Sequence, residues 1–310
     1  MSPPTPRPGA RRRWLFFVPI PFALAGICWW LTEPLERPDD GSGRVASRPL
    51  PISEAADTPR ADSDSASVAW PEGKMEGMPA KRLLLNFLER TRRRLDAVEG
   101  YTATFRRQER IGGKLGPEQT LRMKARSRPF AIYLKFLAPK AGKEVVYASG
   151  KHDNKVIAHS GDWKDKLIPR LRLDPTGAIA LADSRHPITD AGLVHLTDKL
   201  VGFRRMDLHD AESQTVLDRV RDAEGRDWLR SVHTHPDPKS NRPFARVEVL
   251  YDPDTRLPRR IDSFDWLAPG HDGEPLPLAE RYIYDDLDLE APLSDIDFDP
   301  ANPAYAFSRF

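Results

Sequence analysis

The sequence predicts a mainly β (α+β) fold, an incomplete antiparallel β-barrel of about ten strands with covering helices, after an N-terminal membrane helix. Many short runs alternate apolar and polar residues and are separated by turn residues, which is typical of half-buried antiparallel strands. Two runs have helical spacing, and they do not alternate regularly with the strands, which argues against a parallel α/β sheet. A sheet of so many strands must curl or close to protect its edges.

Composition excludes several classes of function. The 310 residues allow one or two domains, and 48 Lys and Arg nearly balance 46 Asp and Glu. A net charge of +2 does not indicate a nucleic-acid binder. The single Cys excludes a disulfide framework and a multi-Cys metal site within one chain.

The N-terminal residues indicate a membrane address. Residues 1–13 are basic and are expected to be a cytoplasmic tail, and residues 14–31 carry no charge. As a helix, this uncharged stretch would be about 27 Å long, close to the hydrocarbon thickness of a bilayer. We interpret residues 14–31 as a single-pass anchor in the inner membrane, with the C-terminal domain in the periplasm. A cleaved signal peptide and lipidation of Cys28 are the alternatives.

The rest of the chain divides into a linker and a folded domain. Residues 32–79 are rich in Pro, Ser and Asp and poor in large apolar residues, so we expect a disordered linker. Residues 80–310 are expected to fold. Helices are predicted over 81–99 and 189–203, with Thr189 as N-cap of the second. Ten strands are predicted over residues 101–106, 121–126, 130–136, 145–149, 155–159, 214–221, 227–235, 245–251, 258–266 and 278–285.

The order of these elements resembles a known superfamily. A helix leads into the strand Tyr101–Gln108, the pair Arg128-Pro129 follows, and the next strands are Ile132–Pro139 and Glu144–Ser149. This arrangement resembles the opening of the LolA and LolB lipoprotein carriers. The tail, with residues 282–289 and 293–298, is similar to a narrower group, the membrane-anchored bacterial domain-of-unknown-function family 1571. The resemblance covers residues 80–310.

The resemblance implies an apolar half-barrel cavity that holds acyl chains. The inner rows of the first strands would line it: Tyr101, Ala103, Phe105, Leu121, Met123, Ile132, Leu134 and Phe136. The second helix would act as a lid whose underside carries Leu193, Leu196, Leu200 and Phe203. In the carriers, an arginine on an early strand holds the lid, and Arg106 and Arg122 are both candidates here. The anchor is a departure, because a shuttling carrier must be free, and the middle and tail are longer than in a minimal carrier.

No catalytic or metal-binding motif is complete. His233 and His235 with Asp237 form part of a metal-hydrolase signature, but Pro238 stands where the pattern needs another His. We expect these imidazoles to be exposed polar residues at a strand end. Residues 295–299 start like a calcium loop, but Pro300 and Ala306 replace the Gly and Glu that an EF-hand requires. The sequence therefore predicts no enzyme, no cofactor and no metal.

Two functions remain in view. The first is non-enzymatic binding of a lipid or a lipoprotein acyl chain within the half-barrel, in which case the partners are the membrane, lipid or an acylated protein, but no nucleic acid. The second is an envelope scaffold that binds a protein or glycan through its outer face. The apolar rows could also simply fill a core, as they do in many small barrels.

Overall fold

The computed structural model describes residues 68–161, 170–236, 238, 242–271 and 273–308. The cytoplasmic tail, the membrane segment 14–31 and the linker up to residue 67 therefore lie outside the described residues, and their assignments stay predictions. Among the described residues, no helix has both the length and the apolar character that crossing a bilayer requires.

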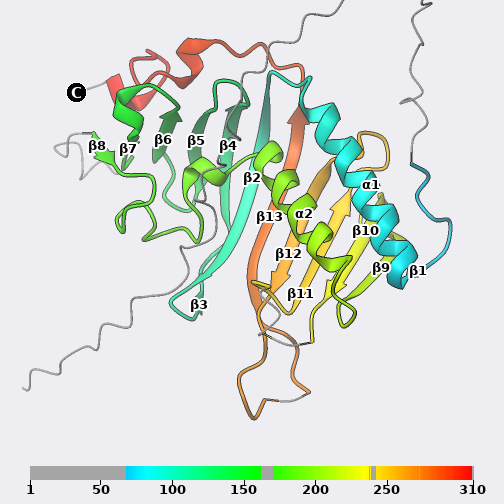
Figure 1. Ribbon diagram of the computed structural model, residues 1–310. Coiled ribbons are helices and arrows are strands. Elements are labelled where there is room, and N and C mark those ends of the chain that lie inside the picture. The colour runs from blue at the N-terminus through cyan, green and yellow to red at the C-terminus, as the bar shows by residue number, and fades with distance from the viewer. Residues whose placement is uncertain (1–67, 162–169, 237, 239–241, 272, 309–310) are drawn as a thin grey trace, which may run out of the picture. The chain divides into compact units, whose positions relative to one another are not determined.

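The described strands form one antiparallel sheet (Figure 1). Its order is β1-β9-β10-β11-β12-β13-β2-β4-β5-β6-β7-β8, and β3 pairs with β2 beside this path. The bounds are β1 Met75–Glu76, β2 Gly100–Ile111, β3 Lys114–Leu115, β4 Gln119–Arg126, β5 Ala131–Ala138, β6 Glu144–Ala148, β7 Val156–His159, β8 Leu171–Leu173, β9 Gln214–Arg221, β10 Asp227–Thr234, β11 Arg246–Tyr251, β12 Pro258–Phe264 and β13 Leu278–Asp288.

The prediction of a mainly β, antiparallel fold with two helices is confirmed. All ten predicted strands are present, as β2, β4–β7 and β9–β13. The three strands that the alternation did not predict, β1, β3 and β8, are two or three residues long, too short to show a period of two. The sheet is open, because β1 and β8 form its two edges and do not pair with each other.

Two helices lie on the same face of the sheet, which we call the inner face (Figure 1). Helix α1, Gly77–Leu95, buries Ala80, Leu84, Leu88 and Leu95 at helical spacing. Helix α2, Leu193–Asp207, begins four residues later than predicted, because residues 188–190 form a separate 3-10 turn. Gly192, with a φ of 98°, makes the bend between the two, so Gly192 and not Thr189 precedes the helix.

The folded part begins before residue 80, in contrast to the predicted boundary. Trp70, at 3% exposure, packs on Phe87 and Tyr251 with ring centroids 5.0 and 5.7 Å away. Its indole N–H donates to the carbonyl of Asp218 at 2.8 Å, and strand β1 pairs with β9. A single Trp inside a Pro-rich stretch therefore belongs to the core of the domain.

A second layer covers the other face of β5, β6 and β7, which we call the outer face. Phe298, Tyr305 and Phe307 of the C-terminal segment are buried against Ala131, Tyr133, Val146, Ala148 and Ile157. The rings of Tyr133 and Tyr305 stack at 4.0 Å. Because these strands are covered on both faces, four consecutive residues of β5, 131–134, are buried, where sequence alternation predicted a half-buried strand.

Candidate functional site

The predicted cavity residues share the inner face of three neighbouring strands. In the register of β2 with β4, Phe105 faces Leu121 and Ala103 faces Met123, and Met123 in turn faces Leu134 of β5. All eight are buried, with exposures of 7% or less: Tyr101, Ala103, Phe105, Leu121, Met123, Ile132, Leu134 and Phe136. They belong to one core cluster with residues of α1 and α2. The alternation of the sequence therefore located one continuous apolar surface, and ligand binding to it stays a prediction.

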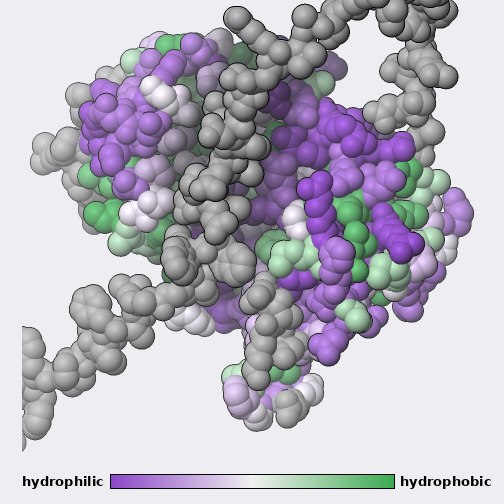
Figure 2. Space-filling model, viewed as in Figure 1, coloured by the Kyte–Doolittle hydropathy of each residue, from purple (hydrophilic) through white to green (hydrophobic). Residues whose placement is uncertain are grey.

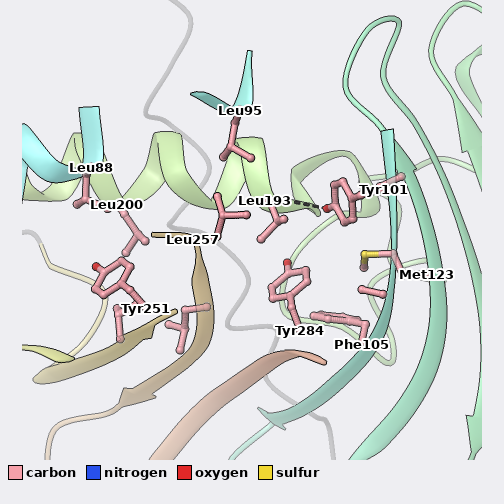
Figure 3. Packing of buried hydrophobic residues seen from close by; sticks show 14 of the residues in the cluster. Leu88, Leu95, Tyr101, Phe105, Met123, Leu193, Leu200, Tyr251, Leu257 and Tyr284 are labelled. Carbon is pink, nitrogen blue, oxygen red and sulfur yellow. Dashed lines mark hydrogen bonds between the residues drawn. The ribbon is translucent and has the colours of Figure 1, made fainter. Parts of the chain in front are cut away.

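The predicted lid residues lie on α2, but only part of the predicted stripe is buried. Leu193 and Leu200 are buried, Leu196 packs on the core from a partly exposed position, and Phe203 is partly exposed. Figure 3 shows Leu193 and Leu200 directed toward the aromatic side chains of the sheet. The buried face of α2 also includes three polar residues, Thr197, Arg204 and Asp207, which hydrophobic spacing could not reveal.

Residues 174–192 form an irregular segment that contains a single 3-10 turn at residues 188–190. This segment covers another part of the inner face, and we call it the covering segment. Ile188 and Ala191 pack against the core cluster. The segment is otherwise attached by polar contacts. Lys140 donates to Asp183 at 2.7 Å, and Arg185 donates to the carbonyl of Arg110 at 2.9 Å.

Arg107 is the arginine of β2 that reaches this segment, and neither sequence candidate does. Its Nη1 donates to Ser184 Oγ at 3.1 Å and its Nη2 to the carbonyl of Asp183 at 3.2 Å. Arg106 points to the outer face, where its Nε donates to Asp285 at 2.8 Å, and Arg122 is exposed. The correction follows from the period of two in a strand, because Arg107 continues the row of Tyr101, Ala103 and Phe105.

Two buried carboxylates lie near these contacts: Glu109 is 3.7 Å from Arg107, and Glu280 is 3.2 Å from Arg185. Glu109 and Glu280 are both buried, and the hydroxyl of Tyr282 donates to Glu109 and lies 3.4 Å from Glu280. His186 of the covering segment contacts Glu280 at 2.9 Å. Burial raises the pKa of Tyr282 well above its ordinary value, and the two carboxylates raise it further. Glu109 also continues the odd-numbered row of β2, but nothing in the apolar alternation pointed to it.

His233 and His235 are buried, so the expectation that they are exposed was wrong. His233 contacts Thr215 and Ser231 through its two nitrogens, each at 3.2 Å. His235 contacts the carbonyl of Phe244 at 3.1 Å and Asp207 at 3.2 Å. Within the described residues there is no group of three metal-ligating side chains. These hydrogen bonds explain how both imidazoles can be buried, because each is part of a buried polar network.

Residues 98–307 match the model of a protein family described as "Protein of unknown function (DUF1571)". The chain belongs to this family. This match confirms the family that the tail, residues 282–289 and 293–298, had predicted. No curated protein matches the chain.

Solved structures that resemble the DUF1571 chain are distant in sequence. A DUF1329 family protein from Desulfovibrio piger is 14% identical with a TM-score of 0.37, and the match covers 71% of this chain and 97% of that one. A putative outer membrane lipoprotein-sorting protein domain from Vibrio parahaemolyticus is 12% identical, with a TM-score of 0.33 and coverages of 69% and 95%. A LolA superfamily protein from Nitrosomonas europaea is 11% identical, with a TM-score of 0.27 and coverages of 69% and 96%.

The DUF1571 domain also has a pocket that the sequence did not indicate. It has a volume of about 310 Å³ and lies where β10 ends, away from the apolar rows of β2, β4 and β5. Its lining combines residues at the end of β10, the residue before β11 and residues between β12 and β13: Thr234, His235, Pro236, Pro238, Ala245, Trp266, Leu267 and Leu276. None of the predicted cavity or lid residues lines this pocket.

Proposed function

We propose that this DUF1571 domain binds, without catalysis, the acyl chain of a lipid or of an acylated protein against the inner face of β2, β4 and β5. One observation carries the proposal: among the described residues, this apolar surface is covered by the irregular segment 174–192 and by the start of α2, not by further strands. The covering segment is attached mainly by polar side-chain contacts at its edge: Arg107 and Lys140 donate to it, and its own Arg185 donates to the carbonyl of Arg110.

The strands are held to each other more strongly than the covering segment is held to the sheet. The strands are joined by continuous backbone hydrogen bonds, whereas each side-chain hydrogen bond of the covering segment contributes about 0.5–1.5 kcal/mol net. Partly exposed ion pairs such as Lys140–Asp183 contribute even less, about 0–1 kcal/mol. Each methylene of a ligand that is buried on the inner face contributes roughly 0.8 kcal/mol. An acyl chain can therefore offset the loss of these contacts, so the covering segment can open while the sheet stays intact.

The proposal includes a location. Residues 1–13 are basic and residues 14–31 are uncharged, which favours an inner-membrane anchor that leaves residues 68–310 in the periplasm. Protease added to spheroplasts should then digest the folded domain, and a cytoplasmic protein should survive in the same sample. Protection of the domain in intact spheroplasts, with digestion after lysis, would exclude this topology.

The scaffold alternative has no comparable support. The outer face of β5, β6 and β7 is already covered by the chain's own Phe298, Tyr305 and Phe307. On β2 and β13 the outer face carries paired charges, such as Arg106 with Asp285. No contact among the described residues favours a particular protein or glycan partner there.

A charge placed on the lid tests the acyl-binding proposal. The variant Leu196→Glu puts a carboxylate on the side of α2 that packs on the core, where burial of a charge opposes binding. Ile179→Glu is the matched control, because Ile179 in the covering segment is 72% exposed. We expect the delipidated full chain and the control to bind a fluorescent fatty acid, and Leu196→Glu to lose binding while its circular dichroism is unchanged. Absence of binding by the unmodified chain would show that the inner face is only a core.

A further inference from the structure

The C-terminal end of α2 holds a buried cluster of charged side chains. The carboxylate of Asp207 accepts hydrogen bonds at its Oδ1 from Arg242 Nε at 3.0 Å and Nη2 at 2.9 Å. His235 Nε2 lies 3.2 Å from the same oxygen. Although burial alone raises the pKa of Asp207, the hydrogen bond from His235 and the charge of Arg204 hold that pKa below its ordinary value. Asp207 is therefore an ionised carboxylate whose Oδ1 is already shared.

Arg204 lies one turn earlier on the same face of α2 and is less well satisfied. Its Nε lies 3.0 Å from Asp207 Oδ2, but its Nε and Nη1 have no hydrogen-bond partner among the described residues. The side chain is 3% exposed. Buried guanidinium N–H groups without acceptors are rare, because each unmade hydrogen bond costs the full desolvation of the donor. The Nε and Nη1 groups of Arg204 could therefore each donate a hydrogen bond to an added acceptor.

Arg204 and Arg242 are two buried cations beside the buried carboxylate of Asp207. Burial and the charge of Arg242 lower the pKa of Arg204, and the charges of Asp207 and Tyr251 oppose this shift. An acceptor placed beside Arg204 would satisfy the N–H groups that have no partner among the described residues.

This site lies at one end of the apolar row beneath α2. Leu193 and Arg204 are eleven residues apart, which corresponds to about 16 Å along a helix. Leu200 lies between them on the same face, and Figure 3 shows it above Tyr251, with Leu257, Tyr284 and Tyr101 following toward the start of α2. A ligand with an anionic end at Arg204 would therefore lay its apolar part over Tyr251, Leu257 and Tyr284 and reach Tyr101, where the surface of the proposed function begins.

We propose that Arg204 anchors the carboxylate of a bound fatty acid, with the acyl chain directed along α2 toward Leu193. This inference rests on the proposed function and adds the headgroup and the direction of the ligand. The planar guanidinium matches a carboxylate, which can accept two parallel hydrogen bonds. A phosphate monoester would bring about −1.5 to −2 charges into this buried site, where each charge is costly to bury, so a carboxylate with a single charge is the better match.

The test compares two ligands that differ only in charge. Palmitate and hexadecanol displace the neutral probe phenylnaphthylamine from the delipidated full chain, and the ratio of their affinities is measured. Arg204→Met removes the guanidinium, and Arg205→Met is the matched control, because Arg205 pairs with Glu89 on the surface. Hydrogen bonds to charged groups contribute roughly 1.5–3 kcal/mol, so the palmitate-to-hexadecanol ratio should fall by about 10-fold to 100-fold in Arg204→Met only.

The outcomes separate the two proposals. If both ligands bind and Arg204→Met leaves their ratio unchanged, the anchor is wrong and acyl binding stands. If the unmodified chain binds neither ligand, the proposed function is wrong, and the ligand assigned to Arg204 is excluded with it. Should Arg204→Met unfold, Arg204→Lys serves as the second variant: it keeps the charge but loses the planar fork, so the ratio should fall by a smaller factor, and an unchanged ratio would overturn the anchor.

Discussion

The hydroxyl of Tyr101 accepts a hydrogen bond of 2.9 Å from the backbone N–H of Leu193, the first residue of α2. Both residues are buried, and this contact joins the first long strand of the sheet to the helix that covers it. A Cβ atom at Gly192 would lie 3.1 Å from the same hydroxyl, so the glycine and the tyrosine fit each other closely. The start of the lid is therefore fixed by one side chain of the proposed binding surface.

The variant Tyr101→Phe removes this acceptor and leaves the N–H of Leu193 buried. We expect the free energy of unfolding to fall by about 1–3 kcal/mol, which is the cost of a buried donor without a partner. Hydrogen exchange at Leu193 should accelerate. Tyr147→Phe, a buried tyrosine of the same core cluster on β6, is the control. Equal exchange at Leu193 in both variants would contradict the role given to Tyr101.

The adjacent arginines Arg106 and Arg107 of β2 provide a control and a test variant for the attachment of the covering segment. Arg107→Ala removes the contacts to Asp183 and Ser184, so trypsin should cleave after Arg185 faster and the fatty-acid probe should enter faster. Arg106→Ala removes pairs with Asp285 and Glu118, neither of which belongs to the covering segment, and both rates should stay as in the unmodified chain. Equal rates for the two variants would show that the covering segment is held by other contacts.

Trp70 provides a test of where the domain begins. Loss of its ring contacts with Phe87 and Tyr251 leaves a cavity, so Trp70→Ala should lower the free energy of unfolding by about 3–5 kcal/mol in urea titrations. Trp228→Ala is the control, because Trp228 is only partly buried, and its effect should be smaller. A fragment of residues 80–310 should be less stable than one of residues 68–310 by at least this amount, because it also lacks β1 and the first residues of α1. Identical melting of the two fragments would restore the later boundary.

Alkaline pH should destabilise the domain through Tyr251. Burial raises the pKa of this hydroxyl from 10.0 to about 12, although the hydrogen bond with Ser231 and the charge of Arg204 work against the shift. The folded state therefore favours the neutral phenol. The contribution of the buried Tyr251 phenol to the free energy of unfolding is complete below pH 10, and it is lost as the pH rises through the pKa of about 12 in the folded state. The loss is on the order of 2–3 kcal/mol. In urea titrations across this range, Tyr251→Phe should show a shallower decline, and an unchanged slope would contradict the assignment.

Local periodicity predicted the strands and the apolar rows because those features repeat within a few residues. It failed where the cause is distant in the chain. Trp70 is buried by Phe87 and Tyr251, and Asp207 is buried because Arg242, 35 residues later, pairs with it. Arg107 was missed for a different reason. The odd-numbered row of β2 continues past its apolar part, and the sequence alone gave no reason to expect charged residues on the inner face.

An acyl species bound at the inner face should be detectable by mass spectrometry of an organic extract of the purified protein. The chain purified without delipidation should carry an acyl species in near-equimolar amount. The same species should be missing from the extract of Leu196→Glu and present in that of Ile179→Glu. An unmodified chain whose extract contains no acyl species, and which takes up no fatty acid when one is added, would contradict the account.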